Sequence, residues 1–385
     1  MMSLARCFNV DDFRKLAKRR LPSPIFNYID GGADDEVTLK RNTSAFNDCD
    51  LVPSVLRDIS SIDMSTTVFG QKIDMPLFLA PTAMHRLYHH DGEKATSRAA
   101  EKFGTFFGMS TIATTSIEEV GNLTSGPKLF QLYIHKDRGL TDNLIERCQR
   151  ANFKALCLTV DTIVAGNRER DHRTGFTTPP KLTLASLISF ALHPEWTLNY
   201  LMHERFKLPN LPHTEKDGQS IETSVINYIN SQFDPTMNWK DAEYVAKKWK
   251  GAFAIKGIVS VEDAKKAVDI GATAIMISNH GGRQLDASMS PFDVLADIVD
   301  AVGDKVDVIL DGGVRRGTHV LKALALGAKA CSFGKGYLYA LSAGGQPGVE
   351  AVLRIMHAEI KRGMTLMGCR NVKEITRDKV IFRKK

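Results

Sequence analysis

Short apolar runs rich in β-branched residues recur along the chain, and turn residues follow each run. Apolar runs of this length, bounded by turn signals and followed by helical periodicity, are typical of βα units. The runs span residues 75–83, 105–111, 128–134, 155–162, 252–258, 274–282, 307–314 and 330–336.

Amphipathic helical patterns follow most of these runs. In residues 260–272, 290–303 and 316–328, an apolar face returns every three to four positions. Near-continuous apolar strands that alternate with such helices predict a parallel sheet covered on its outer face. Eight units favour closure into a (β/α)8 TIM barrel of the α/β class over a doubly wound open sheet. We therefore predict one domain over residues 1–385, with its barrel at 75–365.

Three segments lie outside the repeated units. Residues 1–74 begin with a helical pattern and end, at 62–74, in an alternating stretch that predicts a small hairpin lid. Residues 166–240 follow the fourth strand and far exceed a usual βα loop of ~2–6 residues. Residues 366–385 form a C-terminal tail.

The middle of the long excursion, residues 182–207, combines an apolar face with a basic end. We favour an amphipathic helix that caps the barrel, with contact to a membrane surface as the alternative. Its longest apolar stretch, residues 182–192, is shorter than the ~20 residues that span a bilayer.

Composition narrows the class of protein. The apolar fraction of 43% supports a large core, and the net charge of +7 is dispersed along the chain, which does not favour a nucleic-acid partner. The six cysteines show no C-x-x-C spacing, so we expect buried thiols in a reducing compartment and no metal centre. The N-terminus turns charged early and shows no secretory signal, which predicts a cytoplasmic protein, peripheral at the inner membrane face if the excursion binds lipid.

In a barrel of this kind the chemistry sits where the strands end. Polar, basic and small residues close almost every apolar run of this chain. They are Thr82, Ala83, Ser110, Gln131, Tyr133, Thr159, Asp161, Arg168, Lys256, Ser278, His280, Arg283, Asp311, Gly313, Arg315, Gly334 and Lys335.

His280 is the candidate base, because a carboxylate such as Asp161 on its far ring nitrogen would strengthen it. Arg283 and Arg168 each offer a fork for a substrate carboxylate, which predicts an acid as substrate. The glycines after His280 let the backbone turn sharply and approach a bound group closely.

The late segments "DGGVRRG" and "FGKG" follow strands seven and eight, where barrels commonly bind phosphate. Lys256 stands inside an apolar strand and would be costly to bury unpaired. Two roles fit it: a Schiff base with a carbonyl substrate, or a positive charge beside a cofactor that becomes anionic on reduction.

Several motifs together resemble the FMN-dependent α-hydroxy acid dehydrogenase and oxidase family, which includes glycolate oxidase and L-lactate dehydrogenase. They are "APTAM", "TVDTIVAGNRERD", "AIKGI", "SNHGGRQLD" and "DGGVRRG". The resemblance covers essentially the whole chain, and the excursion is most similar to that of bacterial L-lactate dehydrogenases.

The resemblance implies a role for each matched position. His280 would be the base, Asp161 its partner, and Arg283, Arg168, Tyr28 and Tyr133 would hold the substrate. The FMN ligands would be Pro81, Thr82, Ala83, Ser110, Gln131, Thr159, Lys256, Ser278, Asp311, Gly313, Arg315, Gly334 and Lys335.

One position departs from the family, which usually has arginine where this chain has Lys335. A point charge there replaces a bidentate fork, so we expect FMN to bind still, but less tightly.

The implied reaction converts an (S)-2-hydroxy acid to a 2-oxo acid and then passes electrons to oxygen, a quinone or a protein. The modest residues Ala83, Ile112 and Ala165 would line the substrate's side chain and predict room for more than glycolate. Family barrels often form tetramers, which implies a homotetramer.

Two other classes stay open from the residues alone. A flavin-free phosphate-binding barrel would act as an aldolase or isomerase through Lys256. A basic module would bind nucleic acid or lipid through its net charge. Neither explains His280, Asp161 and two arginines at strand ends.

Overall fold

A computed structural model describes residues 3–176, 181–204, 206–211 and 234–383 of the protein. Its centre is a closed barrel in which the strands run in the order β10-β11-β4-β5-β6-β7-β8-β9, and every neighbouring pair is parallel. This confirms the predicted (β/α)8 barrel. The strands are β4 (Leu77–Thr82), β5 (Phe107–Ser110), β6 (Lys128–Leu132), β7 (Ala155–Thr159), β8 (Ala252–Ile258), β9 (Ala274–Ile277), β10 (Asp307–Asp311) and β11 (Ala330–Phe333).

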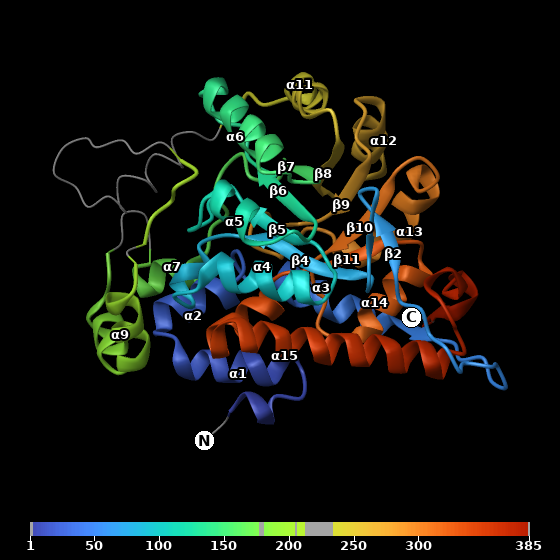
Figure 1. The fold of residues 1–385 in the computed structure, drawn as a ribbon, viewed down its shortest axis with the longest axis horizontal. Coiled ribbons are helices and arrows are strands. Elements are labelled where there is room, and N and C mark those ends of the chain that lie inside the picture. Colours follow the sequence, from blue (N-terminus) through green and yellow to red (C-terminus); the bar gives the residue numbers. More distant parts are fainter. Residues whose placement is uncertain (1–2, 177–180, 205, 212–233, 384–385) are drawn as a thin grey trace.

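Helices surround the barrel (Figure 1). The strands are apolar on their outer side as well, and the apolar faces of these helices pack against them and keep them buried. Local caps fix where some of them begin: Ser116 and Glu119 form a capping box at α5, as Asn238 and Asp241 do at α11. The helices that follow strands are α4 (Gly92–Lys102), α5 (Ile117–Leu123), α6 (Arg138–Arg150), α11 (Trp239–Trp249), α12 (Val261–Asp269), α13 (Pro291–Val302), α14 (Gly317–Ala325) and α15 (Lys335–Met367).

The N-terminal segment contributes three helices before the barrel: α1 (Val10–Arg20), α2 (Ser23–Asp30) and α3 (Val37–Ser44). Helix α1 lies along α15, so the two ends of the chain pack together (Figure 1). Short 3-10 turns occupy Leu4–Arg6, Ala45–Asp48, His85–Leu87 (η3), Val372–Glu374 and Arg377–Lys379.

A small antiparallel hairpin, β2 (Thr66–Val68) with β3 (Gln71–Ile73), follows these helices. The backbone N–H of Phe69 donates to Asp307 at 2.9 Å, where β10 begins, and the Phe69 ring packs edge-on against Phe78 and Phe106. The hairpin therefore covers the amino ends of the barrel strands, opposite the mouth. The C-terminal strand β12 (Val380–Phe382) pairs with β1 (Cys49–Leu51).

The excursion after β7 contains α7 (Glu169–Thr174), α8 (Leu184–Ala191) and α9 (Pro194–Met202), and residues 177–180, 205 and 212–233 of it lie outside the described part. The expectation of a single amphipathic helix over 182–207 is wrong. His193 separates two helices, and Pro194 starts the second, because proline suits the first helical turn and breaks a helix interior. Trp196 fastens α9 to the barrel by donating to the Leu87 carbonyl at 2.8 Å.

All six cysteines are free thiols and buried, as predicted. Burial raises the pKa of Cys148, Cys157 and Cys331, which lie in the apolar interior.

The carboxylate of Asp30 joins several elements at the barrel's edge. Its oxygens accept from Arg14 at 2.5 and 2.9 Å, from Arg170 at 2.9 Å and from the Tyr339 hydroxyl at 2.8 Å. Burial alone would raise the pKa of Asp30, but the bonds from Arg14 and Tyr339 hold it well below its usual range. One carboxylate thus connects α1, α2, α7 and α15.

We expect Asp30→Asn to lower the free energy of unfolding by about 2 kcal/mol at pH 7, because charge-assisted bonds to a buried acceptor are lost. A depressed pKa stabilises the fold above the ordinary carboxyl value and ceases to do so as pH falls, so the difference should shrink below about pH 4. Chemical denaturation across pH measures it. Asp11→Asn removes exposed pairs, with Lys15 at 2.7 Å and with Arg14 at 3.9 Å, and leaves the bonds from Arg14 to Asp30 in place, so it should cost much less; equal losses in both variants would contradict the prediction.

Candidate active site

A cavity of about 640 Å³ opens at the carboxyl ends of the barrel strands. All but two of the predicted site residues line it. Those present are Tyr28, Pro81, Thr82, Ala83, Ser110, Gln131, Tyr133, Thr159, Arg168, Lys256, His280, Arg283, Asp311, Gly313, Arg315, Gly334 and Lys335.

The other two residues, Asp161 and Ser278, support the lining from behind. Asp161 follows β7, and its Oδ1 lies 2.9 Å from Nδ1 of His280, whose ring faces the cavity. Burial would raise the pKa of Asp161, but the His280 and Lys256 charges bring it below its ordinary value. Asp161 therefore stays ionised and orients the His280 ring, with Nε2 as the outward nitrogen.

The turn after β9 explains the glycines beside His280. His280, Gly281 and Gly282 have φ values of 58°, 67° and 72°, in the left-handed region that glycine adopts without strain. A Cβ on Gly282 would lie 2.6 Å from the backbone of Leu39, so α3 can approach only a glycine. Ser278 steadies the turn by accepting from the His280 N–H at 3.1 Å.

Two arginines share one aromatic ring at the cavity wall. The guanidinium carbons of Arg283 and Arg168 lie 4.8 and 5.5 Å from the centroid of the Tyr28 ring. Burial, together with the nearby Arg168 charge, lowers the pKa of Arg283. Like charges held this close favour an anion between them, as a substrate carboxylate would supply.

Lys256 and Asp311 form a buried ion pair at the ends of β8 and β10. Nζ of Lys256 lies 3.1 Å from Asp311 and donates to Ser278 at 3.1 Å, while Ser278 and Ser332 donate to Asp311 at 2.6 and 2.5 Å. Burial opposes the charge of Lys256, yet Asp311 and Asp161 raise its pKa above the ordinary value. The lysine therefore presents a fixed positive charge to the cavity.

Two buried polar atoms in the cavity wall have no hydrogen-bond partner among the described residues. They are Nε2 of Gln131 and Oγ1 of Thr159, at the ends of β6 and β7. The other end of the Gln131 amide accepts from Ser110 at 3.0 Å, which fixes its orientation. Buried polar groups are seldom left unpaired, so this wall fits a ligand with a polar edge.

The late glycine segments meet α3 and α2. A Cβ on Gly313 would lie 1.8 Å from the Asn42 carbonyl oxygen, and its φ is 74°, so only glycine fits there. Lys335 donates to the carbonyls of Asp30 and Gly31 at 3.0 and 2.8 Å, so two of its N–H groups are already engaged. Burial, with Arg283 and Arg315 nearby, holds the pKa of Lys335 well below its usual range.

Several lining residues do not follow from the strand-end pattern. They come from α3, from the turn before α4, from the excursion and from the end of the His280 turn: Asn42, Thr43, Tyr88, Tyr200, Phe206 and Gln284. Gln284 alone had a signal, because it stands beside Arg283; its amide donates to the carbonyls of Asp161 and Val164 at 2.9 and 2.7 Å.

The fold and site define a (β/α)8 barrel in which a carboxylate-backed histidine and two arginines share one cavity. The chain matches the FMN-dependent dehydrogenase family over residues 17–382, and it belongs to that family. The family resemblance drawn from the sequence is confirmed.

Relatives of known activity cover nearly the whole chain. An L-lactate oxidase of Nostoc sp. (strain PCC 7120 / SAG 25.82 / UTEX 2576) is 42% identical, over 97% of this chain and 98% of the relative. Glycolate oxidase 1 of Oryza sativa subsp. indica is also 42% identical, over 96% and 94%. An L-lactate dehydrogenase of Vibrio parahaemolyticus is 40% identical, over 96% and 97%.

Among solved structures, the monotopic membrane protein (S)-mandelate dehydrogenase matches with a TM-score of 0.93 and 34% identity. The match covers 98% of this chain and all of that one. The protein is therefore an enzyme that oxidises α-hydroxy acids with FMN.

The cavity fits this cofactor. The unpaired Gln131 and Thr159 atoms and the cationic Lys256 suit the polar edge of a flavin that gains negative charge on reduction. The flavin-free aldolase alternative is not supported, because a Schiff base needs a neutral amine and Lys256 is held protonated by Asp311.

Removing the Thr159 hydroxyl tests whether this group serves cofactor binding or the stability of the fold. We expect Thr159→Val to leave the flavin-free protein as stable as wild type or more so, because an unsatisfied buried group disappears, and to weaken FMN binding about fivefold or more. Thermal melting and fluorescence titration with FMN measure the two effects. Thr141→Val is the matched control: its buried hydroxyl accepts from the His135 N–H at 3.2 Å and lies outside the cavity, so it should destabilise the protein and spare FMN affinity. The reverse pattern would contradict the assignment.

Proposed function

We propose that the enzyme oxidises (S)-2-hydroxy acids with an apolar side chain, L-lactate or larger, and that His280 is the base. The observation that carries this proposal is the hydrogen-bonded imidazole of His280, which lies 2.9 Å from Asp161 and lines the same cavity as Arg283 and Arg168. A base and an anion clamp at one mouth suit a substrate with both a hydroxyl and a carboxylate.

Substrate binding starts at the carboxylate. Arg283 and Arg168 supply the positive charge, and Tyr28 and Tyr133 line the same cavity. Charge-assisted bonds of this kind fix the acid's orientation as well as its affinity. The Cα hydroxyl would then face His280.

His280 takes the hydroxyl proton through Nε2, because Nδ1 is engaged by Asp161. The ionised Asp161 stabilises the imidazolium that forms, and the closed turn over Gly281 and Gly282 keeps the ring in place. When bound, FMN supplies the two-electron acceptor for the Cα hydrogen.

Other residues prepare the cavity for the cofactor. Lys256, Gln131, Ser110 and Thr159 would hold the flavin's polar edge, with the backbone of Pro81, Thr82 and Ala83 along its ring. Asp311, Gly313, Arg315, Gly334 and Lys335 would hold the ribityl chain and phosphate, while Ser278, outside the lining, positions Lys256.

The substrate's side chain would meet an apolar wall. Ala83, Ile112 and Ala165 leave space in it, and the excursion adds the rings of Tyr200 and Phe206. Aromatic rings at the mouth suit an alkyl or aryl group better than the hydrogen of glycolate.

Anaerobic flavin bleaching tests both the substrate class and the base. We expect L-lactate and (S)-mandelate to bleach the holoenzyme with a second-order rate constant at least about tenfold above that of glycolate, because each adds apolar contacts. Stopped-flow absorbance measures the rates. A preference for glycolate would refute the proposed side-chain pocket.

His280→Gln in the same assay should slow bleaching by about 10³-fold, and Asp161→Asn by less, because the ring remains but loses its orienting charge. Both variants should keep their flavin. His172→Gln, which changes a lining histidine with no place in the proposed chemistry, is the control. A His280→Gln enzyme that bleaches at the wild-type rate would sink the role of His280.

The excursion supports a second proposal, peripheral membrane contact with a membrane quinone as electron acceptor. The stretch from α8 to α9 has seven apolar residues that are each more than half exposed: Leu184, Leu187, Ile188, Leu192, Leu198, Leu201 and Met202. Clustered apolar exposure of this size marks an interaction surface. No helix within the described ranges is long and apolar enough to cross a bilayer. Assembly as a homotetramer stays a prediction from the family resemblance.

We expect the holoenzyme to float with anionic phosphatidylglycerol vesicles. The double variant Leu187→Glu/Leu198→Glu should remain unbound, because membrane insertion would have to bury two negative charges. Val55→Glu/Leu56→Glu, which alters exposed apolar residues elsewhere, should float like wild type. Quinone-containing vesicles should reoxidise the flavin faster than air does. Wild-type protein that stays with the lipid-free fraction would overturn membrane contact.

A further inference from the structure

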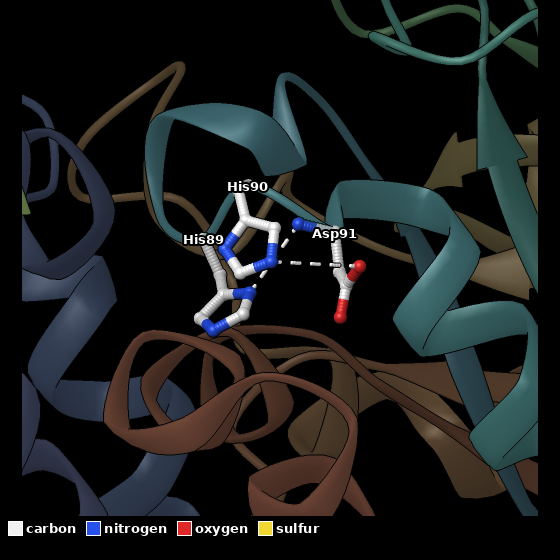
Figure 2. A group of neighbouring side chains, drawn as sticks. All are labelled: His89, His90 and Asp91. Atoms are coloured by element: carbon white, nitrogen blue, oxygen red, sulfur yellow. Dashed lines mark hydrogen bonds and ion pairs between the residues drawn. The ribbon is translucent and has the colours of Figure 1, made fainter. Parts of the chain in front are cut away.

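A cluster of potential metal ligands lies between η3 and α4, outside the active-site lining. His89, His90 and Asp91 are consecutive, and one ligand atom from each lies within 4.8 Å of the others (Figure 2). His89 is already engaged here, because its Nδ1 accepts from the Asp91 N–H at 3.3 Å and its ring stacks on the His90 ring with centroids 4.3 Å apart. A metal ion at Nδ1 would have to replace this long hydrogen bond. The sequence predicts no metal centre, because its cysteines lack metal-binding spacing and these histidines match no metal-binding motif.

The facing atoms of His90 and Asp91 are both acceptors. Nδ1 of His90 lies 2.9 Å from Oδ1 of Asn199, so Nδ1 carries the hydrogen and Nε2 presents a lone pair. That Nε2 lies 3.8 Å from a carboxylate oxygen of Asp91 (Figure 2). A cation placed between these two lone pairs would be attracted by both.

Asp91 occupies the N-cap position of α4, yet its side chain makes no capping bond. Its backbone is already helical, with φ −67° and ψ −22°, whereas a capping side chain needs an extended residue at this position. The carboxylate turns toward His90 (Figure 2).

Helix α9 supplies the surroundings of the cluster. The His203 ring stacks on the His90 ring, with centroids 3.8 Å apart, and Nδ1 of His203 lies 2.7 Å from the Asn199 carbonyl oxygen. Asn199 thus orients two imidazoles, one through its side chain and one through its backbone, and no residue in the described part of the chain donates to either Nε2. Metal-binding histidines characteristically have their other ring nitrogen held in this manner.

We propose that His89, His90 and Asp91 bind a divalent transition-metal ion of the zinc class, and that Asn199 orients the site from α9. Two imidazole nitrogens and a carboxylate form a donor set that binds zinc in preference to magnesium or calcium. Bonds of ~2.0–2.2 Å require the ligand atoms to close by roughly 1 Å. The side chains of His90 and Asp91, 27% and 39% exposed, have room to do so.

Ion binding would strengthen the contact between the cluster and α9, because a cation on Nε2 of His90 polarises the imidazole and so strengthens the hydrogen bond from its Nδ1–H to Asn199. Tyr200, the residue after Asn199, lines the active-site cavity, and α9 also carries part of the exposed apolar surface. A metal bound at the cluster would therefore restrain the α9 end of the excursion, whichever acid the enzyme oxidises.

Isothermal titration of tag-free, chelator-treated holoenzyme with ZnCl2, and separately with MgCl2, tests the site. We expect one saturable Zn²⁺ per chain and no Mg²⁺ binding. His90→Ala should weaken Zn²⁺ at least tenfold, and Asn199→Ala about tenfold through loss of orientation. His193→Ala, which removes an excursion histidine outside the cluster, is the matched control and should bind like wild type.

Hydrogen exchange in α9 provides a second readout: Zn²⁺ should slow it in wild type and in His193→Ala, but not in His90→Ala. The absence of saturable Zn²⁺ binding, or binding that both His90→Ala and Asp91→Asn leave unchanged, would overturn the site. Asp91→Asn decides the matter if His90→Ala fails to retain flavin. Zn²⁺ binding without any change in hydrogen exchange in α9 would overturn the proposed restraint of α9.

Discussion

Closure of eight parallel strands into one ring is the constraint from which the site follows. Parallel strands that share a ring end on the same side, so groups hundreds of residues apart in the chain meet over one mouth. Asp161 and His280 are 119 positions apart and share a hydrogen bond of 2.9 Å. The hairpin β2–β3 covers the other end, which leaves the carboxyl mouth as the place where a ligand enters.

The same closure makes buried charge tolerable. Lys256 and Asp311 come from β8 and β10, separated in the ring by β9, whose trailing Ser278 bonds both. Burying either charge alone would be costly, and the pair with two serine hydroxyls satisfies it. A catalytic surface of fixed charge is thereby built from strand ends rather than from mobile loops.

The sequence predicted the barrel and most of the cavity lining because strand ends can be read from periodicity, while Tyr28 and Pro81 came from the family resemblance alone. It could not show that Ser278 and Asp161 stand behind the lining, because burial depends on neighbouring strands. Asn42 and Thr43 approach the mouth from α3, and Tyr200 from α9, and no local pattern reports such long-range packing. The bonds from Lys335 to the end of α2 were likewise invisible. Pro194, by contrast, carried a readable helix start that the apolar pattern around it obscured.

The burial of all six thiols has a consequence for an enzyme that handles reduced flavin. Oxygen that reoxidises a flavin releases hydrogen peroxide, which attacks cysteine as the exposed thiolate. In this protein every thiol is enclosed, and burial raises the pKa of the deepest ones, so the thiolate is scarcely formed. Any peroxide made at the mouth of the barrel would meet methionine, such as the exposed Met202 and Met289, before it met sulfur in the interior. Oxidative damage should therefore occur mainly at methionines on the surface of the molecule, where methionine sulfoxide can still be repaired.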